Sequence, residues 1–337
     1  MLRTLILGIV QGLTEFLPIS SSAHLSIVPK LLGLRTPELA FDVLLHFGTL
    51  AAVVVYFARD LWAFVLSLVA PRMLGQREAA ARRRQLGLLV IASIPAAIFG
   101  YLLQNWADEQ TSRPLRSAVW LVLTTLIMIA AELWARSHPA PATGGAIREA
   151  EAATAPAAER APASLFEKEP VAPEPAQVQF AAAAARPMTR AEIRRQRQDA
   201  PAEPGSATEE LERLPLRKAA GIGLAQAVAL IPGTSRSGVT ISAGLFEGIS
   251  REAAARFSFL LSIPAILGAG VLKLGDLSQA SESTAQLAVG FLAAAVSGFL
   301  AVSFLIRMLR THTLWPFIWY RLIAGGLFVV LLATVRG

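Results

Sequence analysis

Long uninterrupted runs of apolar residues recur along the chain, and six of them are long enough to cross a lipid bilayer. A transmembrane helix needs about 20 consecutive, mainly apolar residues. All six tryptophans lie close to the ends of such runs, where indole rings favour the level of the lipid headgroups. We therefore predict transmembrane helices over Leu39–Phe57, Leu86–Leu103, Ser117–Trp134, Phe257–Leu274, Ala285–Ile306 and Phe317–Val335.

Two further apolar stretches, Leu5–Leu32 and Ala219–Phe246, are interrupted by polar residues around a proline. Pro18 and Pro232 each precede a group of serines, which gives both stretches the pattern of a helix, a break and a second helix. Irregular backbone at membrane depth is tolerated only inside the protein or along a wet cavity. We therefore predict two re-entrant helical hairpins.

The two halves of the chain resemble each other at a nearly constant offset. Phe41–Leu45 corresponds to Phe257–Leu261 at an offset of 216, and Gln11 and Pro18 correspond to Gln226 and Pro232. Chance similarity between segments rich in Leu and Ala is the alternative. If the repeat is real, each half holds one hairpin and three spans, and this odd number brings the second hairpin in from the opposite face. The predicted fold is an all-α polytopic membrane protein with an inverted-topology repeat, over residues 1–136 and 218–337.

Composition agrees with the hydrophobic pattern. Of 337 residues, 54% are apolar and 16% are charged, and the mean hydropathy is +0.52. An average soluble domain carries about 25% charged residues, so this chain is not an ordinary soluble protein. It contains no cysteine, which excludes disulfides, thiolate catalysis and cysteine metal sites.

The distribution of charge predicts the orientation in the membrane. Residues 71–85 contain five arginines and one glutamate, and Arg307 and Arg310 follow another predicted span. Because cytoplasmic loops carry an excess of Lys and Arg, we place both loops in the cytoplasm and both termini outside. The arginines flank apolar runs, so they indicate orientation in the bilayer and not binding of nucleic acid.

Residues 137–217 form a segment rich in Ala, Pro, Glu and Arg between the third and fourth spans. It holds 10 basic against 12 acidic residues, net −2, and too few apolar residues to build a core. We predict a disordered cytoplasmic insert over 137–217.

Ionisable residues at membrane depth are the first candidates for function. An ionised side chain there costs about 2.5 to 3.5 kcal/mol on insertion scales. Gln11 and Glu15 lie four residues apart, which places them on one helix face. Their oxygens suit a divalent cation, Mg²⁺ or Ca²⁺. The alternative is that the pair only hydrogen-bonds to the adjacent backbone.

A histidine lies close to several hydroxyl groups in the first hairpin. His24 follows Ser20, Ser21 and Ser22, and a histidine near a serine is the minimum for activating a nucleophile. Helix capping explains some of these serines equally well. Asp42 and His46, also four residues apart, are either supporting partners of the metal or of His24, or a pair satisfied at a helix end.

The second hairpin carries the pattern of an anion site, Pro232-Gly-Thr-Ser-Arg-Ser-Gly-Val-Thr240. Glycines let the backbone approach a ligand, and the following helix offers free N–H groups. The planar fork of Arg236 matches phosphate oxygens.

These two motifs resemble those of the undecaprenyl-diphosphate phosphatase family, the bacitracin resistance proteins. The resemblance rests on Gln11-Gly-Leu-Thr-Glu15-Phe-Leu-Pro18-Ile-Ser-Ser-Ser-Ala-His24 and on Pro232–Thr240, and it covers both membrane halves. It implies an inner-membrane enzyme that hydrolyses undecaprenyl diphosphate to undecaprenyl phosphate and inorganic phosphate, recycling the carrier for cell-wall synthesis and conferring bacitracin resistance. Three features depart from the family pattern: Gln at position 11, Ser22-Ala23, and the insert at 137–217, which we expect to lie outside that pattern.

The resemblance also implies roles for individual residues. Catalytic roles fall on Glu15, Ser21, His24 and Arg236, and metal binding falls on Gln11 and Glu15. Phosphate binding falls on Gly233, Ser235, Arg236, Ser237 and Thr240. Three nucleophiles stay open: Ser21 with His24 as its base, His24 itself, or a water that His24 activates. A polyprenyl-phosphate flippase is the alternative function, and the sequence leaves a homodimer open.

Overall fold

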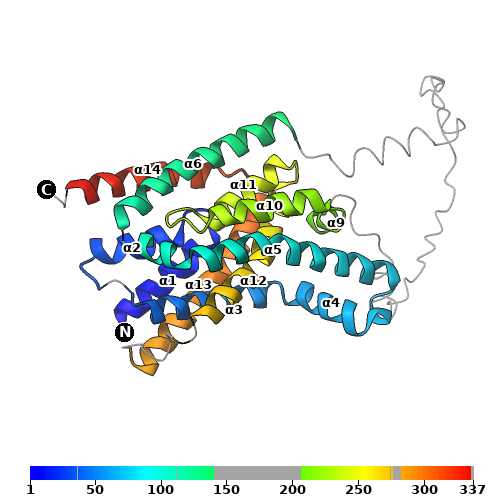
Figure 1. The fold of residues 1–337 in the computed structure, drawn as a ribbon, viewed down its shortest axis with the longest axis horizontal. Helices are drawn as coiled ribbons and strands as arrows, with labels where there is room; N and C mark the ends of the chain where they lie inside the picture. Colours follow the sequence, from blue (N-terminus) through cyan, green and yellow to red (C-terminus); the bar gives the residue numbers. More distant parts are fainter. Residues whose placement is uncertain (36, 112, 140–205, 274, 276–281, 335–337) are drawn as a thin grey trace, which may run out of the picture. The chain divides into compact units, whose positions relative to one another are not determined.

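The computed structural model describes residues 1–35, 37–111, 113–139, 206–273, 275 and 282–334, and these residues form helices and turns without any strand (Figure 1). The first half contains α1 (Leu2–Phe16), α2 (Ser21–Leu31), α3 (Leu39–Tyr56), α4 (Ala58–Val69), the 3₁₀ turn η1 (Pro71–Met73), α5 (Gln76–Thr111) and α6 (Pro114–Ser137). The second contains α9 (Ala207–Glu212), α10 (Leu216–Val228), α11 (Arg236–Phe246), α12 (Arg251–Leu272), α13 (Thr284–Leu309) and α14 (Trp315–Thr334).

Among the residues that the structure describes, six helices have the length and composition of membrane spans: α3, α5, α6, α12, α13 and α14. They coincide with the six predicted spans, which confirms the all-α polytopic fold. The bounds of α3, α6, α12, α13 and α14 differ from the predicted ones by six residues or fewer at each end.

Helix α5 is much longer than predicted. It has 36 residues, or about 54 Å at 1.5 Å per residue, whereas the hydrocarbon core of a bilayer is about 30 Å thick. The prediction over Leu86–Leu103 was therefore too short, because it followed the apolar run alone. The arginine-rich residues before Leu86 continue the helix and pack beside α4, a helix that the hydrophobic pattern did not indicate.

The two interrupted stretches have the predicted order of helix, break and helix. The first is α1, a break at residues 17–20, and α2; the second is α10, a break at residues 229–235, and α11. A serine side chain caps the N-terminus of the second helix in each stretch. Ser20 accepts a hydrogen bond from the backbone N–H of Ala23, and Ser235 accepts one from the backbone N–H of Gly238. That these segments are re-entrant and enter from opposite faces stays a prediction.

Small residues bring α1 against α13 at close range. A Cβ atom on Gly8 would lie 2.5 Å from the backbone oxygen of Gly290, and one on Gly12 would lie 2.0 Å from the Oγ of Ser297. Membrane helices commonly pack through such pairs of small residues four positions apart. This contact joins the first half of the chain to the second.

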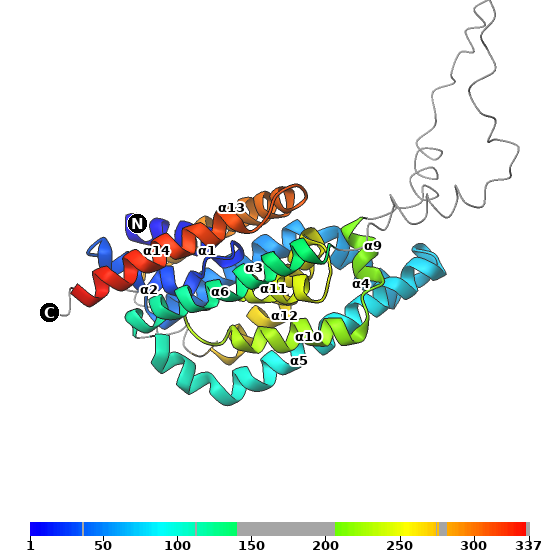
Figure 2. The ribbon, with the colours of Figure 1, turned by 90° about the horizontal axis from the view of Figure 1, so that it is seen from above.

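On the other side of the bundle, α6 and α14 run side by side, as Figures 1 and 2 both show. Helix α2 packs beside α6, and α10 lies beside α5. A hydrophobic cluster fills the space between α2, α6 and α14, and its buried members are Ala23, Ile27, Ala118, Leu121 and Phe328. The first helix–break–helix segment is thus held between α13 and the α6–α14 pair.

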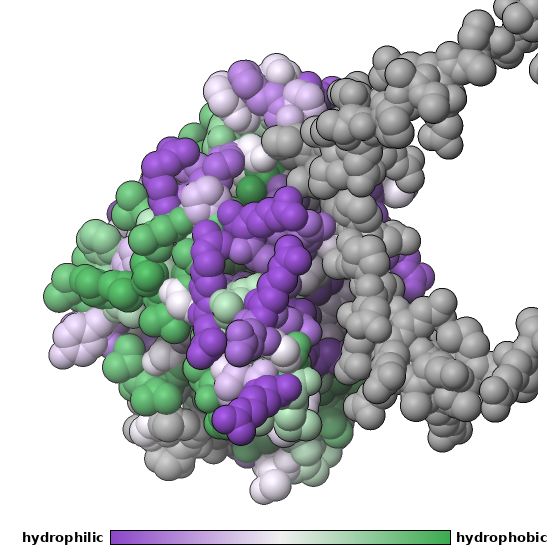
Figure 3. Space-filling view, turned by 90° about the vertical axis from the view of Figure 1, so that its right-hand side faces the viewer, coloured by the Kyte–Doolittle hydropathy of each residue, from purple (hydrophilic) through white to green (hydrophobic). Residues whose placement is uncertain are grey.

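Ion pairs bring both arginine-containing loops to the same end of the bundle. Asp60 accepts hydrogen bonds from Arg82 and from Arg256, each at 3.1 Å. Arg310, after α13, pairs with Glu252 at 3.1 Å. Since Glu252 and Arg256 both lie at the start of α12, the two basic loops share that end. Figure 3 looks onto this end, where hydrophilic residues gather among hydrophobic flanks.

The opposite end of the bundle carries both ends of the described chain (Figure 1). Arg3 at the start of α1 pairs with Glu282, which precedes α13, at 3.0 Å. Helix α14 crosses the bundle from Trp315 to Thr334 and ends on the same side.

The chain divides into two compact units, Met1–Ala140 with Glu210–Gly337, and Pro141–Glu209. The first unit holds all six spans. The predicted insert falls mainly on residues 140–205, which lie outside the described residues. Its last part contains a helix, α9, and Glu210 accepts hydrogen bonds from the backbone N–H and the hydroxyl of Ser250. Helix α10 begins at Leu216, two residues before the predicted boundary at 218, and the division into two repeats and an insert stays a prediction.

Candidate active site

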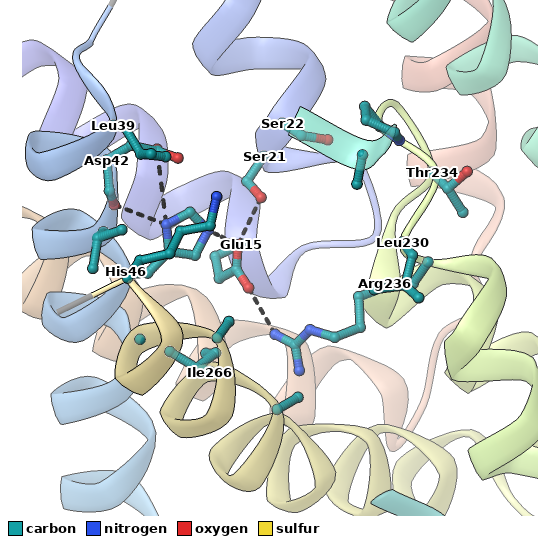
Figure 4. A pocket seen from close by; sticks show the side chains of 18 of the residues that line it. Glu15, Ser21, Ser22, Leu39, Asp42, His46, Leu230, Thr234, Arg236 and Ile266 are labelled. Atoms are coloured by element: carbon teal, nitrogen blue, oxygen red, sulfur yellow. Dashed lines mark hydrogen bonds and ion pairs between the residues drawn. The ribbon is translucent and has the colours of Figure 1, made fainter. Parts of the chain in front are cut away.

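A cavity of about 360 Å³ lies between the two helix–break–helix segments (Figure 4). This volume falls in the range of small-molecule sites, about 300 to 1,000 Å³. Helices α3 and α12 complete its wall. Its polar lining comes from Glu15, Ser21, Ser22, Asp42, His46, Thr234, Ser235, Arg236 and Lys273.

Glu15, at the end of α1, is the centre of the polar lining. Its Oε1 accepts a hydrogen bond from Nη2 of Arg236 at 2.7 Å. Its Oε2 accepts from the Oγ of Ser21 at 2.6 Å and from Nε2 of Gln11 at 3.2 Å. One carboxylate therefore connects the predicted serine, the predicted arginine and the predicted glutamine.

The ion pair between Glu15 and Arg236 crosses from one half of the chain to the other. The two side chains are only 7% and 15% exposed, so removing either partner leaves a desolvated charge. Breaking a buried pair in this way costs about 3 to 5 kcal/mol. The sequence predicted both residues as functional, and the tertiary structure brings them into contact.

The break in the second segment depends on a glycine. Gly233 has φ +93°, and a Cβ atom there would lie 2.1 Å from the backbone oxygen of Ser117 in α6. A side chain at this position meets both unfavourable torsion and a collision with backbone. The backbone N–H of Gly233 donates to the Oγ of Ser22 at 3.0 Å, which fixes the two breaks to each other.

Three predicted phosphate-binding hydroxyls support the loop around Arg236. Ser235 caps α11, and its Oγ lies 3.1 Å from the Oγ of Ser237. Ser237 donates to the backbone oxygen of Leu17 at 3.3 Å, across the two segments. Thr240 donates to the backbone oxygen of Arg236 at 2.8 Å, and its Oγ1 lies 2.6 Å from the Oγ of Ser258 in α12. These bonds hold the arginine's helix in place.

Several buried polar atoms around the cavity have no hydrogen-bond partner. The donors are Nη1 of Arg236 and Oγ1 of Thr234, and the acceptors are Oε1 of Gln11 and Oδ1 of Asp42. Buried polar groups are nearly always paired, so unpaired ones at a cavity mark places where a ligand can bind. The donors suit phosphate oxygens, and the acceptors suit a cation.

The structure also brings Asp42 and His46 of α3 to this cavity. Nδ1 of His46 lies 2.8 Å from the backbone oxygen of Asp42, which is a bond to its own helix. Nε2 of the same ring lies 3.7 Å from Oε2 of Glu15. Nδ1 of His46 also lies 3.8 Å from Oδ1 of Asp42 in the first turn of α3, so the structure shows features of both interpretations: a pair at a helix end and a position beside Glu15.

His24 is not brought to the cavity. Its Nδ1 lies 2.7 Å from the backbone oxygen of Ser20, and its Nε2 lies 2.8 Å from the hydroxyl of Tyr320 in α14. Both ring nitrogens therefore have partners, while the hydroxyl of Ser21 donates to Glu15. In the structure His24 makes no hydrogen bond to Ser21, and its catalytic role stays a prediction.

The sequence analysis did not single out two residues of α14, Tyr320 and Arg321. Arg321 is 1% exposed, and its guanidinium contacts the backbone oxygen of Pro18 in the first break. The signal was present in the sequence, since Arg321 is a lone charge within the apolar run Phe317–Val335. Thr234, which lines the cavity, was named in the motif but given no role.

This arrangement has the parts of a phosphoryl-transfer site. A hydroxyl donates to a carboxylate that can accept its proton, and an arginine with a free nitrogen lies beside them. Positioning and electrostatic stabilisation account for most of the catalysis of phosphoryl transfer, and a guanidinium beside a nucleophile supplies both.

The chain is similar to one family of known proteins over nearly its whole length. A family model described as bacitracin resistance protein BacA matches residues 4–156 and 178–327. The undecaprenyl-diphosphatase of Alcanivorax borkumensis is 40% identical over 332 residues, covering 96% of each chain. That of Geobacter sulfurreducens is 38% identical over 326 residues, covering 95% of this chain and 94% of its own, and that of Chlorobium phaeovibrioides is 36% identical over 340 residues, covering 98% and 97%.

These matches correct one expectation about the insert. The family model extends into residues 137–217 from both sides and leaves only residues 157–177 unmatched. Most of this segment is therefore shared with the family. Its unusual composition led the sequence analysis to treat it as foreign, because low apolar content says nothing about ancestry.

Proposed function

The chain belongs to the bacitracin resistance protein BacA family, and on this premise we propose that it hydrolyses undecaprenyl diphosphate to undecaprenyl phosphate and inorganic phosphate. This reaction recycles the lipid carrier for cell-wall synthesis and accounts for the bacitracin resistance in the family's name. The observation that carries the proposal is the chain of contacts from Ser21 through Glu15 to Arg236 within one cavity.

The diphosphate is bound mainly by the second segment. Arg236 has one unpartnered nitrogen, Nη1, and Thr234 has an unpartnered hydroxyl, and both belong to residues that line the cavity. The beginning of α11 adds the positive end of a helix dipole. Gly233, Ser235, Ser237 and Thr240 act by holding this loop in the conformation that presents Arg236.

Ser21 is the nucleophile that the geometry favours. Its hydroxyl donates to Glu15 at 2.6 Å, so Glu15 can accept the proton as the oxygen attacks the terminal phosphorus. The new Ser21 Oγ–P bond forms as the bond between that phosphorus and the bridging oxygen breaks, which releases undecaprenyl phosphate. Water then cleaves the phosphoserine, and Glu15 returns the proton to Ser21.

Arg236 has two tasks in this sequence. Before the substrate binds, it neutralises Glu15 at 2.7 Å. When the diphosphate occupies the cavity, the same guanidinium contacts its oxygens and stabilises the charge that grows on them in the transition state. Such preorganised donors are worth roughly 10²- to 10³-fold in rate.

A divalent cation, Mg²⁺ or Ca²⁺, fits the residues beside Glu15. Oε1 of Gln11 and Oδ1 of Asp42 are buried oxygens without a hydrogen-bond partner, Oδ1 of Asp42 lying 3.8 Å from Nδ1 of His46, and hard cations take oxygen ligands. Within the described residues no three acidic, histidine or cysteine groups come together as a metal cage. Mg²⁺ is usually held by one or two carboxylates and the substrate's phosphates, so Gln11 and Glu15 would suffice. When bound, such an ion supplies positive charge against the phosphate oxygens.

The apolar part of the cavity suits the lipid. Leu39, Val43 and Phe47 of α3 line it together with Ile266 of α12 and Leu230 of the second break. A polyprenyl chain needs an apolar path beside a polar headgroup site, and this wall provides one.

Charge supports an orientation with both termini outside the cytoplasm and the insert inside. The two basic loops share one end of the bundle, and Lys and Arg accumulate on the cytoplasmic side. Leu39 begins α3 and Lys273 follows the last residue of α12, so the cavity lies toward the end that carries the termini. The proposed place is the bacterial inner membrane, with the site facing outward. A homodimer stays a prediction.

The direct test is release of phosphate by the purified protein in detergent. We expect stoichiometric inorganic phosphate from undecaprenyl diphosphate, and a loss of turnover in EDTA that added Mg²⁺ or Ca²⁺ restores. A flippase moves its substrate between compartments, and detergent micelles have none. Absence of phosphate release, with the folded protein still binding the lipid, would favour the flippase instead.

A further inference from the structure

The turn that presents Ser21 contains a strained residue. Ser20 has φ +74°, and among the described residues it alone adopts a positive φ without being a glycine. Such a conformation is unfavourable for a residue with a side chain and persists only where the surroundings hold it. The neighbours of this turn therefore decide how accurately Ser21 is placed.

One restraint reaches the turn through His24. The ring donates from Nδ1 to the backbone oxygen of Ser20 at 2.7 Å, because a carbonyl can only accept. With Nδ1 carrying the hydrogen, the neutral ring accepts at Nε2 from the hydroxyl of Tyr320 at 2.8 Å. The rings of His24 and Tyr320 are stacked, with centroids 5.8 Å apart and planes 16° from parallel. The Ser20 carbonyl thus fixes the tautomer, and Tyr320 holds the histidine ring in its orientation.

A second restraint comes from the next residue of α14. Nη1 of Arg321 donates to the backbone oxygen of Pro18 at 3.2 Å. The rest of the guanidinium is anchored on α6, through Nε to Thr125 at 2.8 Å, through Nη2 to the backbone oxygen of Leu121 at 2.8 Å, and through Nη2 to Thr124.

The surroundings of Arg321 argue for a specific task. The side chain is buried, and its guanidinium donates hydrogen bonds to carbonyl and hydroxyl oxygens. Burying a guanidinium is costly, and an apolar side chain of similar size often fills such a place with no loss of stability. Helices α6 and α14 already pack closely where Gly325 meets Leu121 and Val122. An arginine is needed here for its several directed donors, one of which reaches the break.

We propose that Tyr320 and Arg321 are positioning residues that hold the turn at Pro18–Ser20 so that the Ser21 hydroxyl stays on Glu15 and in line with the terminal phosphorus. Tyr320 acts through His24 on the carbonyl of Ser20, and Arg321 acts on the carbonyl of Pro18. His24 is then a positioning residue as well, because its hydrogen bond supports the turn. This inference rests on the proposed function.

The first test is Tyr320→Phe, which removes one hydroxyl and keeps the ring. We expect kcat for phosphate release to fall about tenfold, because a small displacement of the nucleophile slows the reaction strongly. KM should stay within twofold, because the Arg236 loop is unchanged. Tyr101→Phe, on an exposed tyrosine of α5, is the matched control and should leave kcat unchanged. An unchanged kcat in Tyr320→Phe would overturn the role of this hydroxyl.

The second test compares Arg321→Lys with Arg321→Met. Lysine keeps the charge and one directed donor, so we expect kcat about 10-fold lower with lysine and about 100-fold lower with methionine, and a KM that changes little in either. Arg310→Lys, at an exposed ion pair, is the control. Equal and normal kcat values in both variants would refute the proposal, as would a rise in KM alone. If the methionine variant does not fold, the lysine variant still decides.

Nitrogen-15 NMR of histidine side chains gives a readout independent of activity. The chain has four histidines, so the signals of His24 can be assigned with one His24→Gln variant. Wild type should show His24 protonated at Nδ1, and Tyr320→Phe should shift the Nε2 resonance while leaving His46 in place. A His24 signal that ignores Tyr320→Phe would contradict the hydrogen bond itself. A wild type that releases no phosphate would refute the proposed function instead, and the NMR result would still test the contact.

Discussion

The breaks of the two helix–break–helix segments each contain a residue with a positive φ, Ser20 in the first and Gly233 in the second. At Gly233 the backbone of Ser117 leaves no room for a Cβ atom. At Ser20 a side chain is present, and the unfavourable torsion is held by a hydrogen bond from His24, which contacts Tyr320 of α14, and by a hydrogen bond from Arg321 of α14 to the Pro18 carbonyl. One break obtains its shape from the residue type, and the other obtains it from restraints supplied by distant helices.

The segments also differ in the chemistry they carry. The offset that relates Gln11 to Gln226 relates Glu15 to Leu230, and both of these residues line the cavity. Gln11 donates to Glu15, whereas neither side-chain atom of the buried Gln226 has a partner. In the proposed mechanism the two segments therefore have separate tasks, with the reacting groups on the first and the anion-binding groups on the second.

The sharpest test of this division is Ser21→Ala. If the first break carries the nucleophile, we expect turnover to fall by at least about 10³-fold, as removal of a catalytic nucleophile commonly does. Ser22→Ala is the matched control, because this hydroxyl accepts a bond from Gly233 and lies 3.3 Å from the Oγ of Ser20 but does not contact Glu15, and its loss should cost about tenfold. Acid-quenched protein incubated with labelled substrate should carry phosphate in the wild type and in Ser22→Ala, and none in Ser21→Ala. Near-normal turnover in Ser21→Ala would move the nucleophile away from this break.

Arg236→Ala tests the second segment's task. We expect turnover to fall roughly 10²- to 10³-fold, since the variant loses the charge that stabilises the transition state and leaves Glu15 without its partner. Arg236→Lys should recover part of the rate, because a lysine keeps the charge without the planar fork. Arg310→Ala serves as a control on an exposed ion pair. Substantial turnover in the Arg236→Ala variant would refute the site.

Gly233→Ala and Ser20→Gly test whether each break keeps its positive φ through the residue type or through hydrogen bonds from its surroundings. The alanine meets backbone 2.1 Å away, so we expect the free energy of unfolding to fall by about 3 kcal/mol or more. The glycine accepts a positive φ freely and should change stability by less than about 1 kcal/mol. Unfolding titrations in mixed detergent measure both. Equal stabilities for the two variants would remove the distinction.

The smallest effect is expected at Gln11 and Gln226, the two glutamines that correspond by the sequence offset. Gln226→Leu removes two buried polar atoms that lack partners, so stability should stay within about 1 kcal/mol of wild type or rise. Gln11→Leu removes a donor to Glu15 and should lower kcat about tenfold. Thermal unfolding and phosphate release, measured on both variants, check this contrast. A Gln226→Leu variant that loses as much activity as Gln11→Leu would give both segments the same role.

Much of the fold followed from local patterns. Six spans, two breaks and the motifs that contain Glu15 and Arg236 were predicted, because membrane helices and buried charges leave clear signals in a sequence. Helix α4 was missed because its 12 residues are too few for a membrane span, and the first turns of α5 were missed because their arginines remove the apolar signal while the helix continues. The neighbours of His24 were also missed, because Tyr320 lies 296 positions away along the chain.

By itself, the sequence determined which segments cross the membrane, where the helices break, and which residue types can handle a diphosphate. These properties depend on composition and short spacing, which a linear chain displays directly. Only the tertiary structure decided which groups meet: that Arg236 and Ser21 share the carboxylate of Glu15, that His46 joins them, and that His24 turns toward α14. Such contacts join residues up to about 300 positions apart, and their geometry depends on how helices pack, which no local pattern records.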